Sequence, residues 1–145
     1  MNIRKFKEAD FQDILDVYAA SKLDELRYEK VDFELLPLDR DMKRLSLLQE
    51  SDIYVCEDQS VIGYAAHCGS EIRALFVHPR GRRKGIGKGL LEFLLSIITG
   101  PAELYVAKSN SPAIELYKKY GFKTVEEFET TYNDIPVLAN KMTRD

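Results

Sequence analysis

The sequence offers little from which a metal site or a disulfide framework could be built. Its 145 residues contain two cysteines and two histidines, which show no metal-ligand spacing. Cys56 and Cys68 fall on neighbouring predicted strands, but they are not symmetric about the turn near Gln59, so their side chains would not face each other. We therefore expect two free, mostly buried thiols and no metal.

Long apolar runs are also missing. No stretch reaches the roughly 20 apolar residues that cross a bilayer, and the charged start of the chain does not resemble a signal peptide. Internal repeats, linkers and low-complexity tracts are absent too. These absences predict a cytoplasmic protein without membrane partners, folded as one domain over residues 1–145.

The sequence also lacks an excess of positive charge, since its formal net charge is −3. This balance argues against nucleic acid as a general partner. The charge is uneven, however: residues 7–41 contain eleven acidic and five basic residues, whereas residues 72–91 contain no acidic residue. We expect an anionic cofactor at the basic segment and a cationic or amine substrate beside the acidic one. The plainer interpretation, which suits most of these carboxylates, is that they solubilise exposed helix faces.

The basic segment has the pattern of a strand, a glycine-rich loop and a helix. Residues 74–77 form a short apolar run that Pro79 stops, and residues 85–98 carry apolar side chains at helical spacing, Ile97 among them. Free N–H groups in the first helical turn attract anions, and glycine lets a phosphate approach them. We therefore predict a phosphate site here. The alternative is that the glycines only relieve crowding and the basic residues are a solvated surface.

Two familiar phosphate loops are excluded by spacing. A nucleotide-triphosphate loop needs Gly-x4-Gly-Lys-Ser/Thr, but Gly87-Lys88 is followed by Gly89 and preceded five residues back by Arg82. A dinucleotide fingerprint needs a third glycine where Leu90 stands.

Periodicity predicts the element order β-α-α-β-β-β-α-β-α-β-β. Asp10 is a plausible N-cap of the first helix, and Met42 belongs to the apolar stripe of the second. The strands that end at Val77 and Val106 are joined by a helix, so they should be parallel neighbours with a right-handed crossover. The fold class is mixed α/β, with ligands beyond the carboxyl ends of these two strands.

Two motifs resemble one family. Residues 82–87, Arg-Arg-Lys-Gly-Ile-Gly, resemble the Arg/Gln-x-x-Gly-x-Gly/Ala signature of the GCN5-related N-acetyltransferase (GNAT) superfamily. Residues 110–122 are similar to that family's Asn-x-x-Ala-x-x-Leu-Tyr-x-x-x-Gly-Phe pattern. The order of elements agrees over nearly the whole chain, although the N-terminal third matches only in pattern. The resemblance implies a largely antiparallel central sheet with a splayed parallel strand pair and flanking helices.

The resemblance implies acetyl-coenzyme A as cosubstrate, without a metal. In this family the strand corresponding to residues 71–77 usually has a bulge and splays from the strand at residues 104–106, and the pantetheine arm pairs with its backbone in the V between them. Arg80, Arg82 or Lys88 could meet the ribose phosphate, and Asn110 would orient the cofactor arm, cap its helix, or both. The residues implied to bind the cofactor are Leu75, Phe76, Val77, Arg82, Arg83, Lys84, Gly85, Ile86, Gly87, Lys88 and Asn110.

The implied reaction is direct transfer of an acetyl group from the thioester to a primary amine. A lysine-like amine has a pKa near ~10.4 and must lose a proton to attack, so a base is needed. Glu71 is the candidate base, acting through water, unless it is only an exposed strand-end carboxylate. A backbone N–H freed by the bulge, near Leu75, would stabilise the oxyanion. Tyr117 stands where the family often has its general acid, although core packing is the alternative.

The sequence thus predicts an acetyl-coenzyme A-dependent N-acetyltransferase. A catalytically silent acyl-coenzyme A sensor or partner-docking module would keep the same site and is the alternative. The acceptor stays open among small-molecule amines and peptide or protein amines, and a homodimer stays open because family members are often dimers. His67 and His78 are weaker candidates, since packing or a loop position accounts for each.

Overall fold

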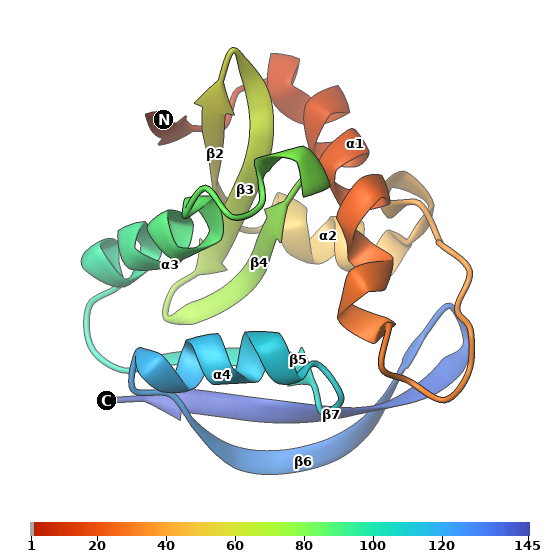
Figure 1. The fold of residues 1–145 in the computed structure, drawn as a ribbon. Coiled ribbons are helices and arrows are strands. Elements are labelled where there is room, and N and C mark those ends of the chain that lie inside the picture. Colours follow the sequence, from red (N-terminus) through yellow and green to blue (C-terminus); the bar gives the residue numbers. More distant parts are fainter. Residues whose placement is uncertain (1) are drawn as a thin grey trace.

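The computed structural model describes residues 2–145, and its element order matches the predicted one (Figure 1). The strands and α-helices are β1 (Asn2–Lys5), α1 (Phe11–Ser21), α2 (Met42–Gln49), β2 (Asp52–Asp58), β3 (Ser60–Cys68), β4 (Glu71–Val77), α3 (Ile86–Ile97), β5 (Ala102–Ala107), α4 (Ser111–Lys119), β6 (Lys123–Tyr132) and β7 (Ile135–Arg144). Short 3-10 helices occupy Glu8–Asp10, Lys22–Leu26, Leu38–Arg40 and Pro79–Gly81.

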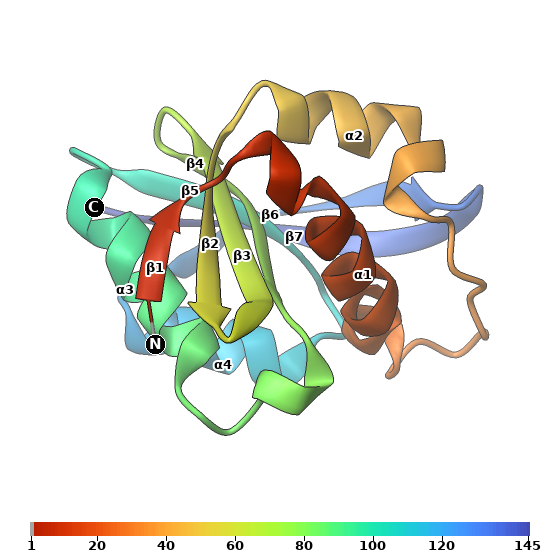
Figure 2. The same ribbon diagram turned by 90° about the horizontal axis from the view of Figure 1, so that it is seen from above.

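The strands form one seven-stranded sheet in the order β1-β2-β3-β4-β5-β7-β6. Every neighbouring pair is antiparallel except β4 and β5, which are parallel. Helices α1 and α2 lie on one face of the sheet, and α3 and α4 lie on the other (Figure 2). The predicted mixed α/β class, with one parallel pair and flanking helices, is confirmed.

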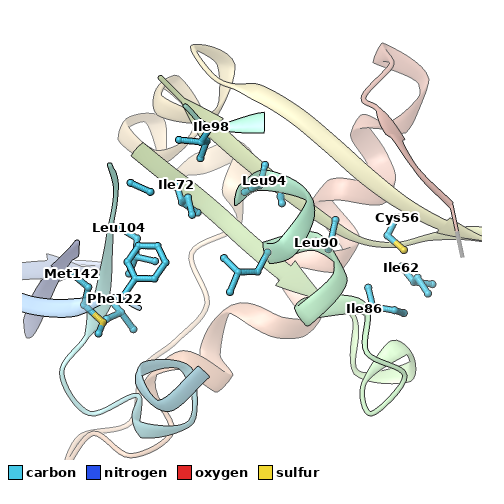
Figure 3. Close-up of a cluster of buried hydrophobic side chains, with 14 residues drawn as sticks. Cys56, Ile62, Ile72, Ile86, Leu90, Leu94, Ile98, Leu104, Phe122 and Met142 are labelled. Atoms are coloured by element: carbon cyan, nitrogen blue, oxygen red, sulfur yellow. The ribbon is translucent and has the colours of Figure 1, made fainter. Parts of the chain in front are cut away.

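Helix α3 is the apolar centre of its face (Figure 3). It packs unusually close to β3 because Gly63 has no side chain: a Cβ there would lie 3.3 Å from atoms of both Ile86 and Leu90. Ile97 was expected in the buried stripe but is 38% exposed. The buried surface of α3 is centred on Leu90, and Ile97 lies at the edge of that surface. The buried members of this helix and its C-cap are Ile86, Leu90, Leu91, Leu94 and Ile98.

The opposite face is covered by α1 and α2, and two predicted details need correction there. Asp10 is the N-cap residue of α1, as predicted, but its side chain makes no capping hydrogen bond, because its carboxylate accepts from the Lys7 backbone N–H at 2.8 Å and from the Arg4 guanidinium. Met42 is 68% exposed. It is the first residue of α2, and helical side chains point toward the N-terminus, so its side chain extends beyond the packed part of the helix.

The parallel pair separates soon after it begins. Glu71 pairs with Glu103 and Ile72 with Leu104, and no later residue of β4 pairs with β5 among residues 2–145. The Glu103 N–H also donates to the carbonyl oxygen of Ser70 at 3.0 Å. The expected splay therefore starts after Ile72, and β5, β7 and β6 turn away from the first four strands (Figure 1).

A β-bulge at Arg73 accompanies this separation. Ala66 of β3 pairs with Ala74, while the next residue, His67, pairs with Ile72, so Arg73 is the extra residue. The insertion reverses the alternation of β4: Ile72 contacts the α3 cluster, whereas Ala74 packs in the α1 cluster. A bulge bends its strand and increases local twist, which fits the departure of β4 from β5.

Within residues 2–145, no helix has the length and apolar character needed to cross a membrane. The same residues contain no group of three or more histidine, cysteine or carboxylate side chains that could hold a metal ion. Cys56 is buried, Cys68 is partly exposed, and both thiols are free.

Candidate functional site

The edge of β4 that faces the opening carries backbone groups without a strand partner. The His78 N–H donates to the carbonyl oxygen of Ile62 at 2.8 Å, which extends the β3–β4 ladder past the Gly63–Val77 pair. Bonded and non-bonded pairs alternate along an antiparallel ladder, so Leu75 and Val77 direct their N–H and C=O groups away from β3. Because β5 has diverged by then, an extended ligand can pair with this edge as an added strand.

A cavity of about 290 Å³ occupies the opening. It lies between β4 and β5, with α1, the Lys22–Leu26 helix and α2 on one face and α4 on the other. Apolar walls with a few polar groups are typical of small-molecule sites. Its ionisable or amide-bearing lining residues are Tyr18, Lys22, Glu25, Arg44, Tyr64, Glu71, Arg73, Tyr105, Asn110, Tyr117 and Tyr132.

The first turn of α3 has the properties of the predicted anion site. The first bond of the helix runs from the Gly89 N–H to the Gly85 carbonyl at 2.9 Å, so the N–H groups of Ile86, Gly87 and Lys88 have no intrahelical partner. Gly85 has a left-handed φ of +76°, and a Cβ built on it would meet nothing within 4 Å. Relief of crowding therefore does not explain Gly85, whose outer surface is open to a ligand.

Crowding does explain another glycine of the loop. A Cβ on Gly81 would lie 3.1 Å from Ile86 Cδ1 and 3.3 Å from Val77 Cγ1. Gly81 thus lets the loop pack on the end of β4, which fixes the start of α3 beside the strand. Crowding thus accounts for Gly81 but not for Gly85.

The basic side chains of the loop are all exposed, and two of them also make polar contacts with other parts of the chain. Arg80 donates to Ser60 Oγ at 2.6 Å, and Arg82 forms an ion pair with Asp24. Arg83 has a φ of +64°, a left-handed conformation that costs a non-glycine residue roughly 1–2 kcal/mol. Such strain is typical of binding loops. The exposed cations of the loop are Arg82, Arg83, Lys84 and Lys88, together with Arg80.

Tyr117 and Asn110 reach the cavity from α4 and its start. The Tyr117 ring packs edge-on against Phe122, with centroids 5.9 Å apart. Burial, followed by the charge of Glu25, raises the pKa of the Tyr117 hydroxyl above its ordinary value, so this group keeps its proton at neutral pH. Asn110 is the N-cap residue of α4, but its side chain accepts no capping hydrogen bond. Its amide is therefore not committed to capping.

Glu71 lies at the closed end of the opening, where the two strands still pair. Its carboxylate accepts a hydrogen bond from Arg73 Nε at 3.1 Å, and Arg73 also binds Glu50 at 2.9 Å. The bulge stands at Arg73, two residues before the position expected near Leu75. The Leu75 N–H faces the opening because of the ladder alternation and the departure of β5, not because the bulge frees it.

Phe76 differs from its neighbours in β4. Its backbone pairs with Tyr64 of β3, so it does not share the open edge. Its ring packs against the rings of Tyr18 and Tyr64, with centroids 5.2 and 5.4 Å away. Phe76 therefore lines the α1 side of the cavity.

The sequence reasoning missed the polar groups on the α1 side. Lys22 is only 9% exposed and pairs with Glu25 at 2.8 Å. Of the eleven acidic residues within residues 7–41, Glu25 alone lines the cavity, so the acidic segment does not make the acceptor side acidic. The sequence does contain a sign that Lys22 is buried. Lys22 lies eight residues after Ile14 and four after Tyr18, so it continues the buried stripe of α1, where an apolar residue is expected.

The two histidines are not among the residues that line the cavity. His67 Nδ1 lies 2.9 Å from the carbonyl oxygen of Gly69, and its ring stacks on Tyr54. His78 Nδ1 accepts the Arg80 N–H at 3.2 Å, and burial, then the charges of Arg80 and Arg82, lower its pKa. Packing and loop geometry account for both, as the plainer interpretation expected.

Comparison with known proteins links this geometry to one family. The acetyltransferase (GNAT) domain family matches residues 49–124. Among curated proteins, the peptidyl-lysine N-acetyltransferase YjaB of Salmonella typhimurium is 34% identical over 77 residues, which are 53% of this chain and 52% of YjaB. An uncharacterized N-acetyltransferase of Methanocaldococcus jannaschii is 30% identical over 86% of this chain and 61% of its own length. The chain spans between 8% and 61% of the lengths of the curated relatives it matches.

Solved structures share the fold. A GCN5-related N-acetyltransferase from Rhodopseudomonas palustris superposes with a TM-score of 0.80 at 17% identity, covering 99% of this chain and 94% of that one. A GNAT superfamily phosphinothricin acetyltransferase from Sinorhizobium meliloti, solved in complex with AcCoA, superposes with a TM-score of 0.72 at 21% identity, covering 99% and 86%.

Proposed function

Because the chain belongs to the GCN5-related N-acetyltransferase (GNAT) superfamily, we propose that it is an acetyl-coenzyme A-dependent N-acetyltransferase. It moves an acetyl group directly from the thioester to a primary amine. The observation that carries this proposal is the continuity of the site. The open edge of β4 at Leu75 and Val77 runs into the loop that begins α3, and Tyr117 reaches the same opening.

The chain's own groups fit the cosubstrate in two places. The N–H groups at residues 86–88 and the positive end of the α3 dipole suit a pyrophosphate, and Gly85 leaves open space in front of them. The backbone of Leu75 and Val77 suits the amides of the pantetheine arm, and the uncommitted amide of Asn110 would orient that arm. Arg80, Arg82 and Lys88 are the candidates for the ribose phosphate. Acetyl-coenzyme A supplies the activated acyl group.

Proton transfer falls to two side chains of the cavity. Tyr117 donates a proton to the departing thiolate, a role that suits a hydroxyl whose raised pKa keeps it protonated. Glu71 accepts the proton of the amine through water, and Arg73 holds its carboxylate in place. The Leu75 N–H, which points into the opening, stabilises the negative charge that develops on the acetyl oxygen.

Calorimetric titration with acetyl-coenzyme A at two salt concentrations tests the proposal. We expect one binding site whose affinity falls as salt rises, and thiol release that requires an added amine. The amine panel includes small amines and a lysine peptide, because one relative is named as a peptidyl-lysine N-acetyltransferase. Absence of binding would overturn the proposal. Binding without thiol release from any amine would favour the silent acyl-coenzyme A sensor.

A further inference from the structure

The α1 side of the cavity contains a buried hydroxyl group without a partner. Tyr18 is 2% exposed, and its hydroxyl makes no hydrogen bond of good geometry within residues 2–145, because the neighbouring Tyr132 hydroxyl is bound to the backbone of Leu36. A buried polar group that stays unpaired costs roughly 1–3 kcal/mol, and such groups in native structures call for an explanation. Because Tyr18 lines the cavity, a bound ligand can supply the missing partner.

A lysine ammonium group lies over the aromatic ring that carries this hydroxyl. Lys22 Nζ lies 5.9 Å from the ring centroid of Tyr18, 5.8 Å from that of Phe76 and 5.3 Å from that of Tyr132. Its ion-pair partner is Glu25, at 2.8 Å. An ammonium group has three N–H donors, and one carboxylate with three aromatic rings leaves donor capacity for a further acceptor atom.

A second cation faces the same aromatic ring. The Arg44 guanidinium lies 5.0 Å from the Tyr132 ring centroid and pairs with Asp41 at 2.9 Å. The charged residues lining the cavity are three cations and two carboxylates: Lys22, Arg44, Arg73, Glu25 and Glu71. Both lining carboxylates already pair with lining cations, while Arg44 pairs with Asp41 and Arg73 pairs with Glu50 as well, so the lining offers an incoming amine no unpaired carboxylate.

We propose that this end of the cavity binds the carboxylate of a small amino-acid-type acceptor, with Lys22 and the Tyr18 hydroxyl as its donors and Arg44 as a supporting charge. This inference rests on the proposed function, because the amine of the same molecule must reach the opening beside Leu75 and Tyr117. A volume of about 290 Å³, shared with the acyl end of the cosubstrate, limits the acceptor to a small molecule. A purely cationic acceptor would meet Lys22 and Arg44 instead of a free carboxylate.

Matched acceptors test the charge preference directly. The twenty standard L-amino acids are compared with their carboxamides and with the decarboxylated amines, using thiol release and mass-spectrometric detection of the N-acetyl product. We expect at least one free acid to exceed its carboxamide by at least tenfold in kcat/KM. The inference would be overturned if the carboxamides were acetylated as well as or better than the free acids. It would also be overturned if none of the twenty free amino acids were acetylated or bound.

Removal of one oxygen atom tests the site itself. Tyr18→Phe should raise KM for the preferred acid roughly 10- to 100-fold, the range expected for a hydrogen bond to a charged group. The KM of the matching carboxamide should stay unchanged. Tm should be unchanged or higher, because the hydroxyl is unsatisfied in the free protein. Tyr54→Phe is the matched control, since Tyr54 lies on β2 and does not line the cavity. Equal KM changes for acid and carboxamide would contradict a carboxylate site.

The charged partner is tested with two substitutions at one position. Lys22→Met should raise KM for the acid at least as much as Tyr18→Phe, and Lys22→Arg should restore part of it. Acetyl-coenzyme A affinity is measured on every variant. If the wild-type protein does not bind acetyl-coenzyme A, the proposed function fails. If it binds and acetylates carboxamides as well as acids, only the present inference fails. Acetylation of a peptide with the same N-terminal residue at the same rate would also overturn it, because a peptide lacks that carboxylate.

Discussion

Asp24 forms an ion pair with Arg82 and thereby links the 3-10 helix after α1 to the loop between β4 and α3. The two side chains are 42% and 38% exposed, so the pair contributes at most about 1 kcal/mol to folding. Asp24 nevertheless neutralises the first basic residue of the loop motif. The 3-10 helix after α1 thus lowers the positive charge of the loop that begins α3.

Asp24→Asn should tighten acetyl-coenzyme A binding roughly two- to fivefold at low salt, because it frees Arg82 and removes a negative charge near a polyanion. The difference from wild type should shrink at high salt, where the charges are screened. Calorimetry at two salt concentrations measures both effects. Asp39→Asn, at an exposed position on another 3-10 helix, is the control. Weaker binding by Asp24→Asn at both salt concentrations would mean that Asp24 positions Arg82 instead.

Gly85→Leu should abolish acetyl-coenzyme A binding while the fold survives. A side chain there has space in the free protein but covers the N–H groups at the start of α3. The left-handed φ of +76° adds a stability cost of roughly 1–2 kcal/mol. Gly100→Leu separates the two effects, because Gly100 has a φ of +79° and equally open surroundings in the turn after α3. Both variants should lose similar Tm, and only the first should lose binding; normal affinity in Gly85→Leu would refute the loop assignment.

Local patterns predicted most of the fold. The bounds 71–77 of β4 follow from an apolar run between turn residues, and the parallel crossover follows from the helix between two strands. Burial within a stripe was harder to predict. Met42 and Ile97 have the right periodicity, yet one starts its helix and the other flanks the contact with the sheet. Periodicity gives the face of a helix, and only tertiary packing sets how far that face extends.

The loop that begins α3 was more predictable than the α1 side of the cavity. Residues 82–88 are contiguous, so their chemistry can be read from one stretch of sequence. Tyr18, Lys22, Arg44 and Tyr132 come from segments that the fold alone brings together. The position of the bulge at Arg73 could not be predicted from the sequence either, because it depends on the register between β3 and β4.

The Asp10 carboxylate should make stability depend on acidic pH. The Arg4 guanidinium, which Asp10 binds through two hydrogen bonds, holds the pKa of Asp10 below its ordinary value. Its stabilising contribution is therefore complete above about pH 4–5 and is lost as the pH falls through the lowered folded pKa. Asp10→Asn should cost about 2 kcal/mol at pH 7 and less at pH 2, as measured by urea unfolding. Asp16→Asn, on the exposed side of α1, should match wild type at both values.

Tyr117→Phe should lower kcat roughly 100-fold, the scale of general acid catalysis, and leave acetyl-coenzyme A affinity within about twofold. Burial raises the pKa of this hydroxyl above its ordinary value near ~10, so the wild-type enzyme should lose no activity through its ionisation below that pH. Tyr120→Phe, in the C-cap residue of the same helix with its hydroxyl bound to Glu92, is the control. An unchanged rate in Tyr117→Phe would assign the acid role to water.

The general base can be identified by comparing two carboxylates that bind the same arginine. Arg73 binds both Glu71 and Glu50, but only Glu71 lines the cavity. Glu71→Gln should therefore lower kcat/KM roughly 100-fold at pH 7, and the loss should shrink toward pH 10, where more of the amine is already neutral. Glu50→Gln removes the other partner of Arg73 and should stay near wild type across the same pH series. If both variants lose activity equally, Arg73 placement matters and proton transfer by Glu71 does not. If neither does, the amine loses its proton to water, and Glu71 is only the carboxylate at the start of β4.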